Sequence, residues 1–224
     1  MYSQVSFGNV IYHPKQITSI PRRFSDFLSP EYSNGRISLT YPNDDDAILY
    51  LFTLITQKHS WEFIYSLLKQ EVDWVRGTAT SAMLIAEGFN LSTSDPVNSR
   101  PVGPIISFAS ESAFTSGMTT APLDDVYMTW PQTGAIFSST KNPETARLFL
   151  SFLMDDEWQK KVGGSGFATR KSFDKRGVFA QMPNMDGIGY IKFMQDRKNV
   201  EWWRFQFESL LGLPQGINPN SIDF

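Results

Sequence analysis

The fold of this chain is decided by one stretch, Arg36-Ile37-Ser38-Leu39-Thr40-Tyr41-Pro42-Asn43-Asp44-Asp45-Asp46-Ala47-Ile48-Leu49-Tyr50-Leu51-Phe52-Thr53-Leu54-Ile55. Residues 36–41 alternate between polar and apolar side chains, which predicts a half-buried strand. The aspartates that follow suit the free amides and the positive dipole end of a starting helix. A helix is therefore predicted from about Asp45 to Gln57. Apolar residues cover most of its circumference, so we expect it to be buried on most sides.

Composition and charge narrow the class of protein. Of the 224 residues, 41% are hydrophobic and 14% aromatic, which is enough to build a core and excludes a disordered chain. The formal net charge is −3 and no basic block stands out, so nucleic acid is not expected as a partner. The longest apolar run, Ala47–Ile55, is far shorter than a membrane span, so no direct membrane insertion is expected. No signal peptide is visible in this chain.

The absence of cysteine, the scarcity of histidine and the lack of known catalytic motifs exclude several kinds of catalytic site. Cysteine is absent, which removes disulfides, thiolate metal ligands and a cysteine nucleophile. His13 and His59 are the only histidines, which disfavours imidazole catalysis and a zinc site. The run Gly163-Gly164-Ser165-Gly166 is followed by Phe167 and so misses the GxSxG spacing, and no P-loop, GxGxxG or HExxH is present. We therefore predict no catalytic residue, no metal ligand and no cofactor.

Strands and helices are predicted to alternate along the rest of the chain, which favours an α/β fold. Strands are expected over 5–12, 102–108 and 126–130, and helices from Ser60, over 78–87, and over 142–153, 155–162 and 197–211. Segments 71–78 and 110–120 are expected to be loops, and 131–134 a turn. The apolar residues of the late helices are expected to lie in the core: Leu148, Phe149, Phe152, Leu153, Trp158, Val200, Trp202, Trp203, Phe207 and Leu210.

Two turns are candidates for a ligand site. Asp44 and Asp46 lie at a strand-to-helix turn, where α/β sheets place their ligands and where a carboxylate would hold a ligand amine or a metal. Trp74, Arg76 and Thr78 precede another helix start, where a guanidinium, hydroxyls and backbone amides would hold a carboxylate or phosphate. The alternatives are structural: helix capping for the aspartates, and a capped helix with a solvated arginine and a core tryptophan for the second turn.

The order of several segments resembles the type 2 periplasmic solute-binding proteins, in the branch named for ferric-iron ABC transporters. The segments that carry the resemblance are Pro21 through Asp26-Phe27-Leu28-Ser29-Pro30 to Gly35-Arg36-Ile37, Trp74-Val75-Arg76-Gly77-Thr78 with Met83–Gly88, Thr129-Trp130-Pro131-Gln132-Thr133-Gly134, and Asn142-Pro143-Glu144-Thr145-Ala146-Arg147-Leu148-Phe149-Leu150 to Glu157-Trp158-Gln159. The resemblance runs from about Val5 to Arg170. Ferric-binding members use two adjacent tyrosines, and this sequence has no such pair. The resemblance is therefore not taken to mean that this chain binds iron.

The resemblance implies a periplasmic-binding-protein type 2 fold, with one complete lobe and the C-terminal part of the other. Residues 1–20 would be a first-lobe strand and crossover, 21–130 the second lobe, and 131–224 the helix-rich returning part of the first lobe. The N-terminal half of the first lobe would be missing, as in a fragment or a reorganised family member. Such proteins are extracellular or periplasmic and deliver their ligand to a membrane transporter.

Three functions follow as hypotheses. In the first, the chain is a non-catalytic solute-binding protein that holds a small polar ligand between its lobes. Asp44 and Asp46 would face positive groups of an amine-bearing or zwitterionic ligand, Arg76 and Thr78 would face negative ones, and Trp74 or Trp130 would stack on it. The second hypothesis is an enzyme on the same fold, of the cofactor-biosynthetic type. The third is an interaction protein that no longer binds a ligand.

Overall fold

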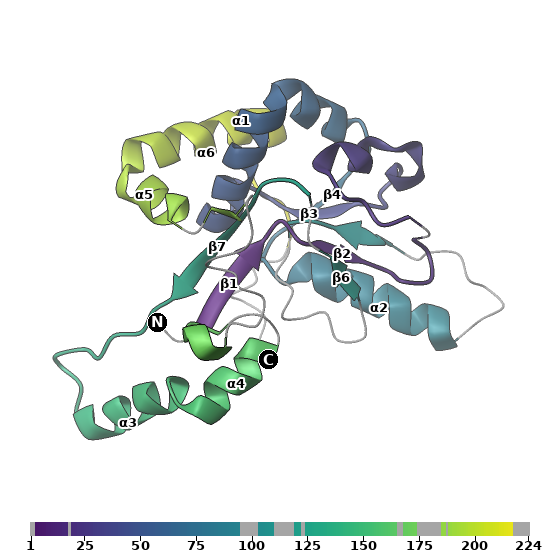
Figure 1. Cartoon of the computed structure of the whole chain (residues 1–224). Helices are drawn as coiled ribbons and strands as arrows, with labels where there is room; N and C mark the ends of the chain where they lie inside the picture. Colours follow the sequence, from purple (N-terminus) through teal and green to yellow (C-terminus); the bar gives the residue numbers. More distant parts are fainter. Residues whose placement is uncertain are drawn as a thin grey trace.

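A computed structural model describes residues 3–17, 19–94, 103–109, 119–121, 124–164, 168–173, 185–186 and 188–216 (Figure 1). The described strands are β1 (Ser3–Phe7), β2 (Val10–Tyr12), β3 (Ser38–Thr40), β4 (Asp73–Val75), β5 (Ile106–Ser107), β6 (Thr119–Ala121), β7 (Tyr127–Gln132) and β8 (Met185–Asp186). The α-helices are α1 (Asp46–Leu68), α2 (Thr80–Ser94), α3 (Pro143–Leu153), α4 (Asp156–Gly164), α5 (Gly189–Gln195) and α6 (Arg197–Leu211), with short 3-10 turns η1 (Phe24–Leu28), η2 (Pro30–Tyr32) and η4 (Lys171–Phe173).

The main sheet has the predicted strand β3 in its interior. β3 pairs with β4 in parallel, and β2 pairs with both β5 and β6 in antiparallel. The two groups join where Ile37 bridges to Ile106 and the Ile105 amide donates to the Arg36 carbonyl at 2.8 Å. This single bridge connects the two-stranded sheet β3-β4 to the three-stranded sheet β5-β2-β6, so that the strands follow one another as β4-β3-β5-β2-β6; the two are together called the main sheet. This sheet includes β2, which belongs to the segment 1–20, a first-lobe strand and crossover in the division of the chain that the resemblance implies.

Three segments differ from the predicted loops and turn. β4 lies within 71–78, β6 includes the end of 110–120, and β7 continues through Pro131 and Gln132. β4 and β6 are three residues each and are formed by pairing with β3 and β2, which a local pattern does not reveal. Pro131 fits in β7 because β8 pairs only with Tyr127 and Met128, so among the described strands β1 is its one neighbour there.

Helix α1 confirms the prediction of a helix buried on most sides. The Asp45 carboxylate caps it, accepting from the amides of Ala47 at 2.9 Å and Ile48 at 3.0 Å. Phe52 is fully buried, and its ring lies 5.9 Å from that of Phe108, 5.9 Å from that of Trp74 and 5.7 Å from that of Phe207. Its side chain therefore joins the sheet to the C-terminal helix α6.

The predicted helix boundary at Ser60 appears as a break within α1. Ser60 has φ 66° and ψ 175°, a conformation that is almost restricted to glycine and costs other residues roughly 1–3 kcal/mol. The chain then resumes as a helix to Leu68. On this second half Trp61 lies against Trp203 of α6, with ring centroids 6.0 Å apart.

The strain at Ser60 gives a prediction. Ser60→Gly is expected to raise the free energy of unfolding by about 1 kcal/mol, because relief of the strain exceeds the extra chain entropy that glycine brings to the unfolded state. Urea unfolding followed by circular dichroism measures the change. Ser60→Ala, which keeps the unfavourable conformation, is the matched control and should not stabilise the protein. Equal stability of the two variants would contradict the prediction.

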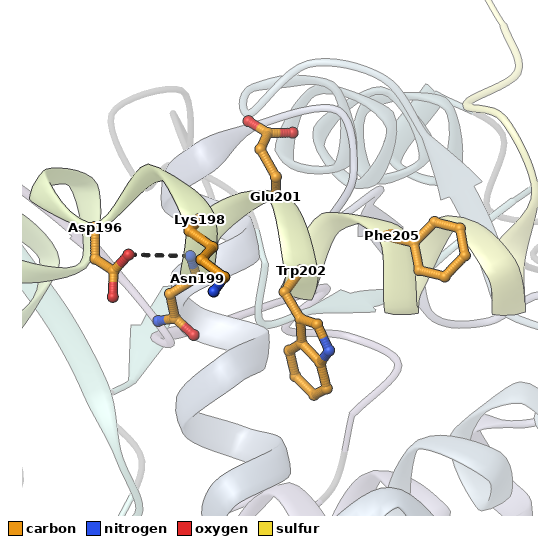
Figure 2. Close-up of a pocket in the computed structure, with 6 residues that line it drawn as sticks. All are labelled: Asp196, Lys198, Asn199, Glu201, Trp202 and Phe205. Carbon is orange, nitrogen blue, oxygen red and sulfur yellow. Dashed lines mark hydrogen bonds between the residues drawn. The ribbon is translucent and has the colours of Figure 1, made fainter.

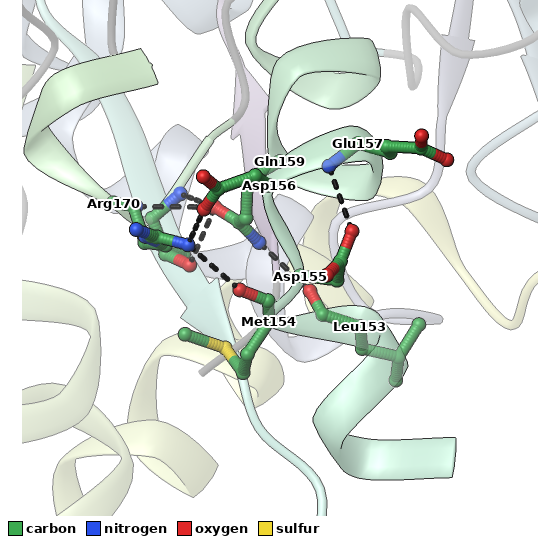
Figure 3. A network of polar contacts seen from close by, with 8 residues as sticks. Leu153, Met154, Asp155, Asp156, Glu157, Gln159 and Arg170 are labelled. Carbon is green, nitrogen blue, oxygen red and sulfur yellow. Dashed lines mark hydrogen bonds and ion pairs between the residues drawn. The ribbon is translucent and has the colours of Figure 1, made fainter. Parts of the chain in front are cut away.

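A second group of elements lies beside the main sheet. β1 runs antiparallel to β7, β7 runs parallel to β8 at its start, and Figure 1 shows the β1–β7 pair leading from the sheet toward α4. The fully buried Gln159 side chain fixes α4 to the segment before η4: its amide nitrogen donates to the Leu153 carbonyl at 2.9 Å, and its oxygen accepts from the amides of Thr169 and Arg170 at 3.0 and 3.1 Å (Figure 3).

The expected burial of α3 is wrong. Leu148 is 71% exposed, Phe149 59% and Phe152 50%, whereas Leu153 is buried. In α6 the prediction holds for Val200, Trp203 and Phe207, but Trp202 is half exposed. An amphipathic pattern identifies the face that a helix can bury, and only the arrangement of the other elements decides whether that face is covered.

Candidate functional site

The three consecutive aspartates between β3 and α1 have three different sets of contacts. Asp44 pairs with Arg76, Asp45 caps α1, and Asp46 pairs with Arg204 and Arg197 of α6. Burial, partly offset by hydrogen bonds from the capped amides, raises the pKa of Asp45 above its ordinary value. The Asp44 carboxylate is therefore bound by the residue after β4, and the Asp46 carboxylate is bound by α6.

Asp44 and Arg76 lie together in a forked ion pair. The Arg76 Nε donates to Asp44 Oδ1 at 3.0 Å and its Nη2 donates to the same oxygen at 2.9 Å, and Nε is also 3.2 Å from Oδ2. The hydrogen bonds raise the pKa of Arg76. The side chains keep 26% and 13% of their surface exposed, so the pair can be reached from solvent. Arg76 is thus paired, not solvated.

The β4–α2 turn is held beside this pair by backbone contacts. The Tyr41 amide donates to the Val75 carbonyl at 3.0 Å, and the Thr40 hydroxyl donates to the Gly77 carbonyl at 3.0 Å. Thr78 follows Gly77, whose positive φ of 85° makes the turn. The parallel pairing of β3 and β4 therefore brings the two predicted turns together at one sheet edge.

Two of the predicted residues stand apart from this pair. The partly buried Trp74 packs its ring 5.8 Å from that of Tyr41 and belongs to the edge of the core. Asp46 holds the C-terminal helix: besides its contact with Arg204, its Oδ2 lies 3.5 Å from Nη1 of Arg197. The neighbouring Asn43 side chain donates to the Gly212 carbonyl at 2.9 Å, which fixes the end of the same helix.

Trp130 is joined to the aspartate turn by a residue that sequence reasoning missed. The ring of Tyr190, in α5, lies 5.1 Å from that of Trp130 and 5.8 Å from that of Tyr50. Burial and the charges of Asp45 and Asp46 raise the pKa of Tyr190 to about 12. The rings of Trp130, Tyr190 and Tyr50 therefore form an aromatic cluster that lies within the electrostatic influence of the aspartate turn. A lone tyrosine at the start of a short helix carries no local signal of this position.

Asp125 ties two segments to α1: the start of η1 at Phe24 and the residue before β7, Val126. This carboxylate, 1% exposed, accepts from Lys58 Nζ and His59 Nε2, both at 2.8 Å, and from the amides of Phe24 and Val126 at 3.2 and 2.8 Å. Burial alone would raise the pKa of Asp125, but these hydrogen bonds together hold it below its ordinary value. Asp125 is thus a structural anchor that the sequence analysis did not identify.

A shallow cavity of about 570 Å³ lies elsewhere, along the outer face of α6 (Figure 2). The residues described as lining it come from α6 and its cap: Asp196, Lys198, Asn199, Glu201, Trp202 and Phe205. None of the predicted site residues is among them. Across the described ranges, no group of three or more histidine, aspartate or glutamate side chains could hold a metal ion. No helix in the same ranges is long and apolar enough to cross a lipid bilayer.

Comparisons with known proteins identify the fold. No protein-family model matches the sequence, and no curated protein matches it. Among solved structures, a substrate-binding protein of an ABC transporter from Agrobacterium tumefaciens is similar over 92% of this chain and 66% of its own, with a TM-score of 0.62 and 14% identity. The periplasmic binding protein AfuA of Actinobacillus pleuropneumoniae, with fructose-6-phosphate bound, gives 0.59 and 14% over 95% of this chain and 68% of its own.

A third similar structure is the spermidine/putrescine ABC-transporter binding protein PotD of Streptococcus pneumoniae. It has a TM-score of 0.52 and 10% identity over 91% of this chain and 68% of its own. The chain therefore has the periplasmic-binding-protein type 2 fold, and it spans about two thirds of the length of these solved proteins. The predicted fold class is confirmed.

The Asp44–Arg76 pair gives a second prediction. Arg76→Ala is expected to lower the melting temperature, because Asp44 would keep its partly buried carboxylate and lose its counter-charge. Adding Asp44→Asn to Arg76→Ala should restore part of the loss, so the two changes are non-additive in a thermal double-mutant cycle. Arg147→Ala is the matched control, because it breaks an exposed pair with Glu144. Equal melting temperatures of Arg76→Ala and Arg147→Ala would contradict the prediction.

Proposed function

We propose that this protein is a solute-binding protein that holds a small, amine-bearing or zwitterionic ligand in a cleft beside the β3–α1 and β4–α2 turns. Residues 21–130 would form the ligand-binding second lobe, 1–20 a first-lobe strand and crossover, and 131–224 the returning part of the first lobe. A membrane transporter would receive the ligand, outside the cytoplasm. The fold supports this proposal, because the similar solved structures are binding proteins of this class.

One observation carries the choice of ligand class: the solvent-accessible Asp44–Arg76 pair at the sheet edge. A zwitterion can replace both halves of such a pair, with its ammonium on Asp44 and its carboxylate on Arg76. Thr78 would add a hydroxyl on the acidic side, and Trp74 and Trp130 would supply apolar and aromatic surface. Asp46 would contribute negative charge from the α6 side of the turn.

The capping of α1 argues against a phosphate ligand. An anion at the start of a helix binds to the free backbone amides there. In this protein the Asp45 carboxylate already occupies the amides of Ala47 and Ile48, and Asp44 and Asp46 flank it. A phosphate would have to displace or approach these carboxylates. The turn therefore favours positive ligand groups over a sugar phosphate.

Calorimetry and thermal shift on the 224-residue protein test the proposal, with putrescine, γ-aminobutyrate and fructose-6-phosphate as probes. The amine or the amino acid is expected to bind, and a probe at a hundred times its dissociation constant should stabilise the protein by about 2.7 kcal/mol. Asp44→Asn and Arg76→Ala should each weaken binding of γ-aminobutyrate roughly tenfold or more. Lys171→Ala, in η4, is a control away from the site. Binding of the phosphate alone, or unchanged affinity in both variants, would overturn the proposed site.

A further inference from the structure

The carboxylates on either side of the α1 cap differ in how completely they are neutralised. Among the described groups, Asp44 pairs with the guanidinium of Arg76. Asp46 meets two guanidiniums: Nη2 of Arg204 donates to its Oδ1, and Nη1 of Arg197 lies 3.5 Å from its Oδ2. Both of these arginines belong to α6, where a spacing of seven residues puts them on one face of the helix. Each oxygen of the Asp46 carboxylate therefore faces an arginine of its own.

Glu201 holds the two α6 arginines together. It lies one turn from each of them along α6, pairs with Arg197 through Oε1, and has its Oε2 3.3 Å from Nε of Arg204. The formal charges of the carboxylates of Asp46 and Glu201 and of the two guanidiniums cancel. The side chains of Asp46 and Arg204 are only 29% and 28% exposed, so water screens their contact only in part. This group of four side chains is thus neutral as a whole.

The core places the α6 arginines in position. Trp203 and Phe207 of α6 are 8% and 0% exposed, and both contact Trp61 of α1, with ring centroids 6.0 and 5.2 Å apart. The docking of α6 therefore does not depend on the ion pairs alone. Because packing presents Arg197 and Arg204 to the aspartate turn, Asp46 is already neutralised before a ligand arrives.

A ligand amine would find one exchangeable carboxylate at this turn. Asp45 accepts from the α1 amides, and Asp46 is held by two guanidiniums, whereas Asp44 exchanges a single partner. A ligand with one ammonium and one carboxylate can replace both halves of the Asp44–Arg76 pair and leave no charge unmatched. A diamine would leave Arg76 without an acceptor, and its second ammonium could reach a carboxylate at Asp46 only by displacing like charges.

We propose that Arg204, assisted by Arg197, determines ligand specificity: by neutralising Asp46, it restricts the site to zwitterions with a single ammonium group and excludes diamines. This inference rests on the proposed function, because it concerns the same site and decides between the amine-bearing and zwitterionic ligands named there. Arg204 is 158 residues from Asp46 in the sequence, so no local pattern links the two.

Calorimetry on the 224-residue protein with γ-aminobutyrate and putrescine tests the inference through the ratio of the two dissociation constants. The wild type is expected to bind γ-aminobutyrate at least about tenfold more tightly than putrescine. Arg204→Met keeps an unbranched side chain and removes the charge, and it should shift the ratio toward putrescine at least about tenfold. Arg197→Met removes the longer contact of 3.5 Å and should shift the ratio in the same direction by less.

Two further variants make the result specific. Arg147→Met removes one positive charge from an exposed pair on α3 and should leave the ratio unchanged. Addition of Asp46→Asn to Arg204→Met should abolish the gain in putrescine affinity, because the freed carboxylate is lost. Circular dichroism checks that each variant is folded, and Arg197→Met carries the test if Arg204→Met is not.

The outcomes separate this inference from the proposed function. A wild type that prefers putrescine, a ratio that neither α6 variant moves, an equal shift in Arg147→Met, or a gain that survives Asp46→Asn would each overturn the role of Arg204 and leave a binding protein in place. A wild type that binds neither probe would overturn the proposed function, and the inference would fall with it.

Discussion

Asp125→Ala is expected to lower the free energy of unfolding by about 3 kcal/mol or more. The side chain is 1% exposed and accepts from Lys58, His59 and the amides of Phe24 and Val126. Alanine would leave these donors without their acceptor, and the buried Phe24 amide has the least access to water as a replacement. The loss exceeds that of a surface ion pair because the Asp125 carboxylate is buried and serves four donors at once, of which the Phe24 amide is itself buried.

The preceding residue provides the matched control for Asp125. Asp124 pairs with Arg22, but the two side chains are 51% and 71% exposed, so water can replace the contact. Asp124→Ala should therefore leave the urea unfolding midpoint almost unchanged, while Asp125→Ala should move it strongly toward lower urea. Similar midpoints for the two variants would show that the carboxylate of Asp125 does not anchor the segments around it.

The contribution of Asp125 also has a defined pH dependence. Because its hydrogen bonds hold the pKa below the ordinary value, the folded state binds this proton more weakly than the unfolded state does. The stabilisation is complete above the unfolded pKa of about 3.9 and is lost as the pH falls through the lower folded pKa. The stability difference between the wild type and Asp125→Asn should therefore shrink below about pH 4. Asp45, whose raised pKa has the opposite effect on stability, is present in both proteins, so its contribution cancels when their stabilities are subtracted.

Phe52→Ala is expected to cost about 3–5 kcal/mol of stability. The ring is fully buried and contacts Trp74, Phe108 and Phe207, so alanine leaves a cavity between the sheet and α6 that these neighbours cannot fill without moving. Urea unfolding followed by tryptophan fluorescence measures the loss. Because Phe52 joins the two layers, the docking of α6 should weaken together with the core.

Two further variants make the result for Phe52 specific. Phe52→Leu keeps most of the buried volume and should cost clearly less than alanine. Phe152→Ala removes the same number of atoms from a ring that is 50% exposed, and it should change stability by no more than about 0.5 kcal/mol. A loss at Phe152 as large as that at Phe52 would mean that α3 is covered in solution.

Local sequence patterns predicted the main helices and the central strand. The alternation of 36–41 and the aspartate cap predicted β3 and the start of α1, and the break at Ser60 coincides with a predicted helix boundary. These features depend on residues that are close in sequence, so their physical causes are local. β4 and β6 were not predicted because they are three residues long and gain their stability from strands far along the chain.

The same distinction between local sequence patterns and tertiary contacts applies to the candidate site. The sequence by itself determined that charged residues stand just before the starts of two helices, and the parallel pairing of β3 with the unpredicted strand β4 places these two turns at one edge. Only the tertiary structure decided that Asp44 pairs with Arg76, that Asp46 instead holds Arg204, and that Tyr190 adjoins Trp130. It also decided that α3 stays exposed although its pattern is that of a buried helix. The reason is physical: a residue type fixes which contacts a side chain can make, whereas the partner is fixed by the packing of elements distant in the chain.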